Sequence, residues 1–322
     1  MFLRSSKLAW RSGSGRLMAE ECVAPDDHVL ERLPLRNGVA PSFVAIPGGC
    51  RLPLLDFLST RFPAIDSATW LARMDRGEVR DERNNPVRPD TPCRPNTRVY
   101  YYRELETETR IPFEEVILHL DEHLLVVDKP HFLPVTPSGR FLQETLLVRL
   151  RQKTGLAHLT PIHRLDRETA GVMLFSHNPA TRGVYQSLFQ QRAVAKVYEA
   201  LAGPLPGATF PLTYRSRMVD GTPFFRMREV PGEANSETVI TALEQRGEHV
   251  LYRLEPITGR KHQLRLHLAS LGIPIVNDAF YPDALPCKAD DVSAPLKLLA
   301  RSLAFNDPLS GATRQYASAR QL

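Results

Sequence analysis

The spacing of apolar residues divides the chain into two parts that meet near residue 110. In the first part, an apolar run at 52–58 precedes a segment whose apolar residues recur at helical spacing. Asp66, or the serine after it, is suited to cap the start of this segment, and Gly77 is suited to end it. With a closing strand predicted at VYYYREL, we expect two short helices and small strands over residues 44–106.

The second part, which follows the linker ETETRIP, alternates strand-like and helix-like patterns. VILHLDEHLLVVDKP predicts two strands joined by a polar turn, and LQETLLVRLRQKTG predicts a helix that ends at Gly155. HVLYRLEPITGRKHQLRLHLASLG predicts a strand, a turn and a helix with one leucine-lined face, and PLKLLARSLAFNDPLSGATRQYAS predicts two strands. A mixed α+β domain is therefore expected over residues 112–322.

Other segments of this domain differ in how deeply they should be buried. A helix is predicted to begin at Asn178, with Val184 on its buried side. In the strand AVAKVYEAL, the period of two puts Lys196 and Tyr198 on one face. Residues 215–235 are polar and rich in turn formers, so we expect a mobile insertion there rather than part of the core.

The N-terminal residues 1–43 show no clear periodicity and are expected to form an irregular arm. Residues 1–17 hold four basic residues and no acid, as in transit peptides, but lack the apolar core of a secretory signal. We expect this segment to be disordered, or not naturally translated, with Met18 as an alternative start.

The composition of the 322 residues, 43% hydrophobic and 24% charged, is that of a soluble globular protein. No apolar run approaches the roughly 20 residues that span a bilayer, so a membrane protein is not expected. A net charge of +5 permits a polyanionic partner without identifying one. The four cysteines lack metal-ligand spacing, and we expect reduced thiols in the cytoplasm and neither zinc nor redox chemistry.

The stretch HRLDRE, residues 163–168, concentrates charge directly before an apolar run. If it is extended, Arg164, Asp166 and Glu168 share one face while Leu165 points inward. A carboxylate between cations has a lowered pKa and stays ionised at neutral pH, which suits a nucleophile or an electrostatic stabiliser. Residue patterns alone nevertheless favour a solvated ion pair, because exposed charge clusters are common.

Other polar residues do not indicate a cofactor. His163, His262 and His267 lack the spacing of a metal-binding helix and are expected in the core or against RNA. Tyr198 alone is typical of a core ring with a hydrogen-bonded hydroxyl. The stretch TGRK is too short to cradle a nucleotide.

Three segments, taken together, resemble the RluA family of RNA pseudouridine synthases over residues 114–320. They are LLVVDKPHFLPVTP with its Lys-Pro pair, HRLDRETAG, and PITGRKHQLRLHLASLGIPIVNDAFY. The second is similar to the family's motif around its catalytic aspartate, although Ala170 stands where a serine is usual. Their order, with KVYEA between the last two, makes the resemblance highly specific.

The resemblance implies a mixed, mainly antiparallel sheet of pseudouridine-synthase type. It also implies isomerisation of an extruded uridine to pseudouridine in large-subunit ribosomal RNA or transfer RNA. That reaction needs no redox cofactor, nucleotide or metal, and we expect none. We expect a monomer.

The same resemblance assigns the site residues. Asp166 corresponds to the catalytic aspartate, Arg265 to its partner and Tyr198 to the residue against the target base, where it would stack and help take the carbon-5 proton. Asp166 would either attack the anomeric carbon or remove a proton from the neighbouring sugar carbon. Arg164 resembles the arginine that enters the RNA in place of the uridine. The other expected RNA contacts are His163, Lys129, Arg260 and Lys261.

The N-terminal unit loosely resembles the alpha-L RNA-binding domain. Arg73 and Arg76 would then face RNA, but neighbouring acids dilute their charge, and a packing domain without strong RNA affinity fits as well. The arginines of the 215–235 insertion are hypothesised to contribute to RNA recognition.

Two other functions compete with this reading. A non-catalytic RNA chaperone or assembly factor on the same fold predicts damage at Asp166, Tyr198 or Arg265, and all three are intact. A nucleoside hydrolase or glycosidase normally needs a second carboxylate, for which Glu168 is the only close candidate.

Overall fold

The computed structural model describes residues 33–285 and 292–322. The predictions for the basic segment 1–17 and for a start at Met18 therefore lie outside the described residues. Within them, no helix is long and apolar enough to span a membrane.

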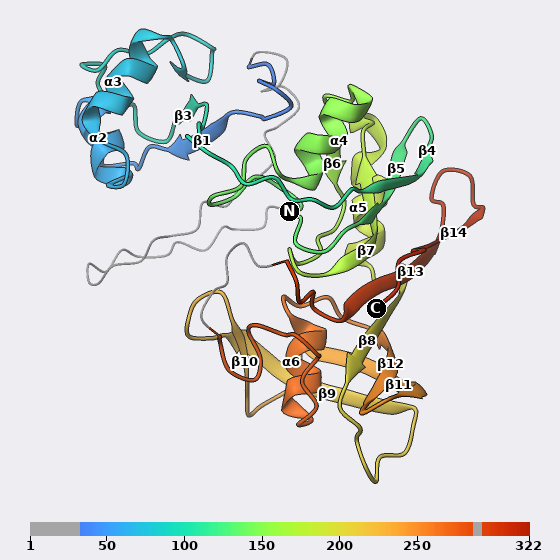
Figure 1. Ribbon diagram of the computed structural model, residues 1–322. Helices are drawn as coiled ribbons and strands as arrows, with labels where there is room; N and C mark the ends of the chain where they lie inside the picture. Colours follow the sequence, from blue (N-terminus) through green and yellow to red (C-terminus); the bar gives the residue numbers. More distant parts are fainter. Residues whose placement is uncertain (1–32, 286–291) are drawn as a thin grey trace.

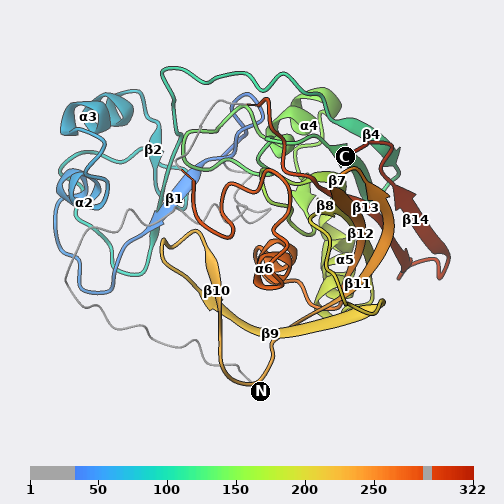
Figure 2. The ribbon, with the colours of Figure 1, turned by 60° about the horizontal axis from the view of Figure 1, so that its bottom comes forward.

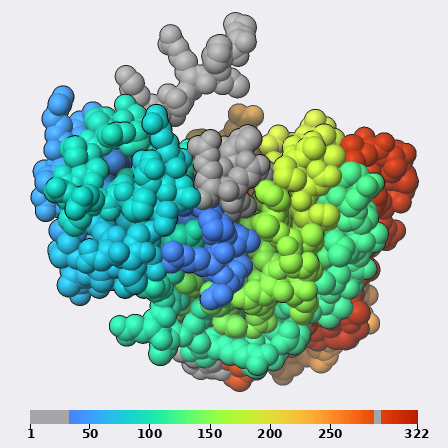
Figure 3. Space-filling view, turned by 90° about the horizontal axis from the view of Figure 1, so that it is seen from above, coloured from blue at the N-terminus to red at the C-terminus, as the bar shows by residue number. Residues whose placement is uncertain are grey.

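The N-terminal unit packs two helices against a small antiparallel sheet with the strand order β1-β3-β2 (Figure 1). Its elements are β1 (Ser42–Ala45), α2 (Leu54–Arg61), α3 (Ser67–Asp75), β2 (Val79–Arg80) and β3 (Arg98–Tyr101). The predicted cap of α3 is confirmed, because the Asp66 carboxylate accepts the Thr69 N–H at 2.6 Å. Strand β1 was not predicted, and it begins inside the expected arm. In space-filling view this unit forms a lobe beside the larger domain (Figure 3).

The two arginines expected to face RNA from α3 are instead engaged within this lobe. Arg73 is only 5% exposed, and its guanidinium lies 5.2 Å from the centre of the Trp70 ring. Arg76 pairs with Glu78 at 2.7 Å and with Glu104 at 3.3 Å. The expectation that Arg73 contacts RNA is therefore wrong, and the likeness to an alpha-L domain stays a prediction.

The larger domain is built on one sheet that has 11 strands within the described residues, in the main order β10-β9-β11-β12-β8-β13-β7-β5-β4. The strands are β4 (Val116–Leu120), β5 (Leu124–Lys129), β6 (Thr160–Pro161), β7 (Ala170–Ser176), β8 (Ala195–Ala202), β9 (Leu212–Asp220), β10 (Met227–Val230), β11 (Ser236–Arg246), β12 (His249–Pro256), β13 (Leu298–Asn306) and β14 (Thr313–Ala317). The helices are α4 (Leu146–Thr154), α5 (Pro179–Gln190) and α6 (Gln263–Ser270). The expected mainly antiparallel, mixed sheet is confirmed: among the described strands, only the β13–β7 pair is parallel.

Helices cover both faces of the sheet near its β4 end. Strands β5 and β7 turn alternate side chains toward α4 on one face and α5 on the other, so Leu125 and Leu124 lie in different cores. Further along the sheet, α6 buries Leu264 and Leu268 on its inner side, beside β9, β10 and β11 (Figure 2). The predicted apolar face of α6 is thus confirmed.

Two predictions about burial are wrong. In α5, Val184 is 41% exposed and the buried residue is Tyr185, one position further along the helix. The polar segment 215–235 is not a loose insertion, because β9 and β10 form an antiparallel hairpin within it. Met218 and Met227 of this hairpin are buried with Leu266 of α6, so one face of the hairpin belongs to the core.

Gly171, at the start of β7, is required by the approach of β13. It pairs with Ala300 in the parallel ladder and has a φ of +116°, in the region that favours glycine. A Cβ at this position would lie 2.2 Å from the Ala300 carbonyl oxygen. The backbone of β13 therefore runs directly against the end of the 163–169 loop.

We predict that Gly171→Ala lowers the free energy of unfolding by about 3 kcal/mol, because the added methyl group displaces backbone and strains φ. Urea unfolding followed by circular dichroism measures this loss. The control is Gly183→Ala in α5, where no atom lies within 4 Å of the added Cβ. That variant should gain about 0.5–1 kcal/mol. Equal stability of Gly171→Ala and the wild type would contradict the proposed clash.

Candidate active site

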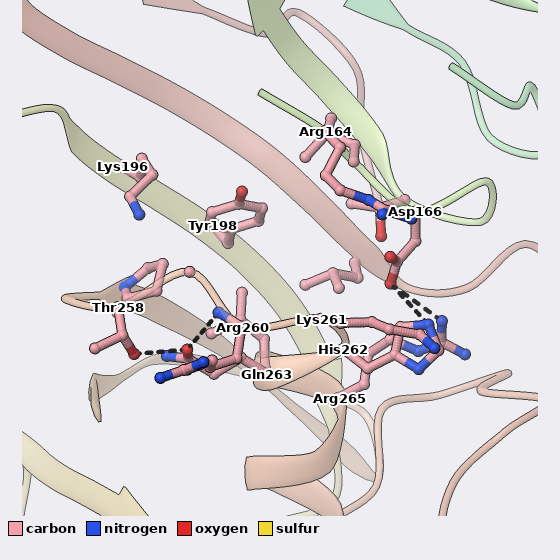
Figure 4. A pocket seen from close by; sticks show the side chains of 16 residues that line it. Arg164, Asp166, Lys196, Tyr198, Thr258, Arg260, Lys261, His262, Gln263 and Arg265 are labelled. Carbon is pink, nitrogen blue, oxygen red and sulfur yellow. Dashed lines mark hydrogen bonds and ion pairs between the residues drawn. The ribbon is translucent and has the colours of Figure 1, made fainter. Parts of the chain in front are cut away.

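A cavity of about 320 Å³ opens between the 163–169 loop, strand β8 and the segment that leads into α6. Arg164 and Asp166 line it from the loop, and Lys196 and Tyr198 line it from β8 (Figure 4). The remaining wall comes mainly from residues 256–265. Three segments far apart in the sequence thus meet at one cavity, and the predicted shared face of Lys196 and Tyr198 is confirmed.

Arg265 connects two carboxylates inside this site. It is 1% exposed and donates from Nε and Nη2 to the two carboxylate oxygens of Asp278, at 2.8 and 2.6 Å. Its third nitrogen, Nη1, lies 3.3 Å from Oδ2 of Asp166. The predicted pairing of Asp166 with Arg265 is therefore present, and Asp278 fixes the plane of the guanidinium.

The Asp166 carboxylate is held ionised while part of it faces the cavity. Its side chain keeps 20% exposure. Burial alone would raise the pKa of Asp166, but the neighbouring His262 and the Arg265 guanidinium outweigh burial and hold that pKa below its usual value. Burial lowers the pKa of His262 to about 4, so Arg265 is the cation beside Asp166 at neutral pH.

Residues at the end of β5 and in the turn that follows it hold the 163–169 loop in place by hydrogen bonds to its backbone. Lys129 is fully buried, and its Nζ donates to the carbonyl oxygens of Pro130, Leu133 and Arg167 at 2.9–3.1 Å. His131 Nδ1 donates to the Glu168 carbonyl oxygen at 2.7 Å. The expectation that Lys129 contacts RNA is wrong, because all of its side chain lies in the interior and its donors bind backbone.

His163 also has a structural role instead of the expected RNA contact. Its Nε2 accepts the Leu174 N–H at 3.0 Å, and its ring stacks on Phe189 with the centres 4.7 Å apart. Burial lowers the pKa of His163 to about 3, so the ring is neutral. It fixes the start of the loop between β7 and α5.

The expected inward direction of Leu165 is confirmed, because this residue is 7% exposed and joins the core under α4. Glu168 does not line the cavity, and its nearest ion-pair partner is Arg167, with Oε1 and Nη1 3.5 Å apart. The chain turns at 167–168, so Glu168 does not share a face with Asp166.

Tyr198 stands in the cavity wall across from Asp166 (Figure 4). Burial raises the pKa of its phenol, and the negative charge of Asp166 raises it further. The hydroxyl is therefore protonated at neutral pH. The ring offers a flat apolar surface with a polar tip to whatever occupies the cavity.

Cations surround the mouth of the cavity. Arg164 is exposed, and its charge helps to hold the pKa of Asp166 below its usual value. Arg260 donates from Nε to the Asn235 carbonyl oxygen at 3.2 Å, and Lys261 donates from Nζ to the Phe224 carbonyl oxygen at 3.3 Å. Both keep further N–H groups for an anionic ligand, as the prediction of RNA contacts at Arg164, Arg260 and Lys261 requires.

The sequence patterns assigned no role to Asp278 and did not place His262 beside Asp166. His262 precedes α6 with a φ of +55°, and its Nε2 lies 3.8 Å from Asp166 Oδ2. Both residues lie inside the third motif, PITGRKHQLRLHLASLGIPIVNDAFY, so that motif could have identified them. A non-glycine residue in a left-handed conformation often marks a functional site.

Known proteins resemble this chain in sequence and in fold. Residues 123–270 match the RNA pseudouridylate synthase family. A Pasteurella multocida protein named dual-specificity RNA pseudouridine synthase RluA is 32% identical over 208 residues, which cover 60% of this chain and 88% of that protein. A Synechocystis protein named an uncharacterized RNA pseudouridine synthase is 29% identical over 239 residues, covering 72% and 81% of the two chains.

Two further relatives extend the comparison. The Saccharomyces cerevisiae tRNA pseudouridine(31) synthase is 33% identical over 186 residues, and the match covers 51% of this chain and 46% of that protein. The solved structure of human RNA pseudouridylate synthase domain containing 1 is similar with a TM-score of 0.53. It is 23% identical and covers 66% of this chain and 86% of its own, which shows a shared fold.

We predict that Asp278→Asn lowers the free energy of unfolding by about 3 kcal/mol or more. The substitution removes one charge of a buried pair and leaves the Arg265 guanidinium without its main counter-ion. Denaturant unfolding measures the change. The matched control is Glu237→Gln, which breaks the largely exposed Arg215–Glu237 pair at 2.9 Å. That control should change stability by less than about 1 kcal/mol. Losses of similar size in the two variants would disprove the buried role of Asp278.

Asp166 should also affect how stability depends on pH. Its folded-state pKa lies below the ordinary value of 3.8. The stabilisation from its ionised form is therefore complete above that value and is lost as the pH falls through the folded pKa. The unfolding free energy of the wild type relative to Asp166→Asn should decline between about pH 5 and pH 3. A difference that is constant or grows over this range would contradict the lowered pKa.

Proposed function

Because the chain belongs to the RluA family of RNA pseudouridine synthases, which isomerise uridine to pseudouridine in RNA, we propose that Asp166 is its catalytic residue. The cavity beside Asp166 is proposed to receive a uridine that has been turned out of the RNA.

The observation that carries this proposal is the Asp166–Arg265–Asp278 arrangement at the cavity wall. An exposed carboxylate would be solvated and weak as a nucleophile, whereas a buried unpaired one would take up a proton. Asp166 avoids both limits, because a guanidinium faces it while one side of it opens to the cavity. Such a carboxylate is reactive and ionised at neutral pH.

The isomerisation breaks the bond between ribose C1′ and uracil N1, turns the base, and joins C1′ to C5. C5 then loses a proton and N1 gains one, so the reaction has no net oxidation or hydrolysis. Asp166 starts it either by attack on C1′ or by removal of a proton from C2′, and both routes need the ionised form that the lowered pKa supplies.

For Tyr198 we propose stacking against the uracil and hydrogen-bond donation. Its raised pKa keeps the phenol protonated, which disfavours a role as a free phenolate base for the C5 proton. Its position across from Asp166 supports a sandwich in which the base lies between the tyrosine ring and the aspartate side of the cavity.

For Arg164, Arg260 and Lys261 we propose contacts with the RNA backbone at the cavity mouth. Their exposed or partly exposed cationic groups surround a site that accepts a neutral base. Of the four arginines in the β9–β10 region, Arg215 pairs with Glu237, and Arg226 lies over the Tyr281 ring. That leaves Arg217 and Arg228 as the better candidates for RNA there.

The proposed substrate is a uridine in transfer RNA or large-subunit ribosomal RNA. Two of the relatives support RNA of this kind: the yeast protein is a tRNA pseudouridine(31) synthase, and the Pasteurella multocida protein is a dual-specificity RNA pseudouridine synthase. Pseudouridine mapping of total RNA from cells with and without this gene would identify the modified position.

We predict that Asp166→Asn still folds and binds RNA but releases no tritium from RNA labelled at C5 of uridine. Loss of the ionised group should reduce the rate by about a thousandfold or more. Asp56→Asn, which changes an exposed aspartate of α2, is the control and should retain full activity. Turnover by Asp166→Asn near the wild-type rate would remove Asp166 as the catalytic residue, provided that thermal unfolding shows both variants to be folded.

A further inference from the structure

Phe224 is exposed in a way that the fold does not explain. It keeps 55% exposure, and it is the only aromatic side chain among the large hydrophobic residues exposed in the described part of the chain. It lies in the loop between β9 and β10, in the sequence GTPFFR. An exposed aromatic ring contributes little to folding, because its apolar surface stays in water.

The loop that carries Phe224 is nevertheless firmly anchored. The Gly221 N–H donates to the Arg226 carbonyl oxygen at 3.0 Å, which closes the loop at its base. The Arg226 guanidinium lies 4.9 Å from the centre of the Tyr281 ring, and the Met227 N–H donates to the Tyr281 hydroxyl at 2.8 Å. The ring of Phe224 is therefore presented by a fixed turn.

The same loop is connected to the cavity that contains Asp166. Lys261 lines the cavity and donates its Nζ to the Phe224 carbonyl oxygen at 3.3 Å. Phe225 packs on Phe280, with the ring centres 5.1 Å apart, and Phe280 in turn lies 4.7 Å from the Arg265 guanidinium. Phe224 thus extends the edge of the site outward, next to a cation that faces the cavity.

We propose that Phe224 stacks on the base of a nucleotide adjacent to the uridine that enters the cavity. This inference rests on the proposed function. A uridine that leaves the stack exposes the faces of its neighbours, and an aromatic ring offers such a base a replacement partner. Lys261, which contacts the backbone of this loop from the segment before α6, would hold the intervening phosphate. Because every base has a flat face, the contact contributes affinity with little dependence on base identity.

The test compares three substitutions at Phe224 by tritium release from total transfer and ribosomal RNA labelled at C5 of uridine. The RNA is taken from cells that lack this gene. Phe224→Ala should raise the apparent KM about tenfold and leave kcat within about twofold, because stacking on one ring contributes binding. Phe224→Trp should match the wild type. Phe224→Leu, which is apolar but has no flat face, should resemble Phe224→Ala.

The control is Leu309→Ala, in the β13–β14 turn, which removes a 46% exposed side chain and should change neither constant. A wild-type KM in Phe224→Ala, or in Phe224→Leu, would overturn the stacking role. The second result would indicate an apolar contact with the RNA that does not depend on a flat ring. A fall in kcat without a change in KM would also overturn it, because Phe224 would then act on the reactive geometry.

A second measurement separates this inference from the proposed function. A single-stranded oligouridylate with one 2-aminopurine is titrated with each variant, and quenching of its fluorescence reports stacking without turnover. Quenching by the wild type and by Phe224→Trp, but not by Phe224→Ala, supports the stacking site even if no RNA releases tritium. Equal quenching by all variants rejects the site while leaving the role of Asp166 untouched.

Discussion

The larger domain depends on compensating one buried guanidinium. Arg265 is almost fully enclosed, and a charge in such a place is tolerated only with well-placed partners. Asp278 supplies a two-point contact, and the Phe280 and Tyr281 N–H groups hold Asp278 in turn, at 2.8 and 3.2 Å. One nitrogen of Arg265 is left for Asp166. The position of the Asp166 carboxylate therefore depends on a loop more than a hundred residues away in the sequence.

The opposite side of the site is fixed by backbone contacts. Lys129 donates to three carbonyl oxygens, of which that of Arg167 belongs to the 163–169 loop, so lifting the loop would remove one of the three acceptors of a fully buried amino group. At the end of the loop, β13 runs so close to Gly171 that a larger residue would push the strands apart. The loop that carries Asp166 is thus fixed by a hydrogen bond to Lys129 and by close backbone packing beside Gly171. Such contacts give a loop residue the rigidity that catalysis requires.

The sequence predicted what depends on local periodicity and on motifs. The Asp66 cap of α3 follows from residue type, and the leucine face of α6 and the shared face of Lys196 and Tyr198 follow from spacing. The burial of Val184 failed because one position turns a helix by about 100°. The RNA contact expected of Lys129 was wrong, and Asp278 was not identified, for another reason. A charged residue is buried only when distant segments supply its partners, and local sequence patterns do not show those partners. The Asp166–Arg265 pair was available only through the motifs, since 99 residues separate the two.

The distribution of charge across the site indicates how RNA would be oriented if the cavity receives a uridine, as proposed. In the interior, Asp166 and Asp278 outnumber Arg265, and His262 is neutral, so this triad carries net negative charge. Negative charge is thus confined to the neighbourhood of Asp166, because Lys196 is a further cation among the residues that line the cavity. Under the proposed function, Arg164, Arg260 and Lys261 would attract phosphates to the cavity mouth. A neutral uracil would approach the Asp166 carboxylate without the repulsion that a phosphate would meet there. In the proposed complex the RNA backbone therefore stays outside and the base enters, so the ion pair that holds Asp166 would also favour the base end of the nucleotide.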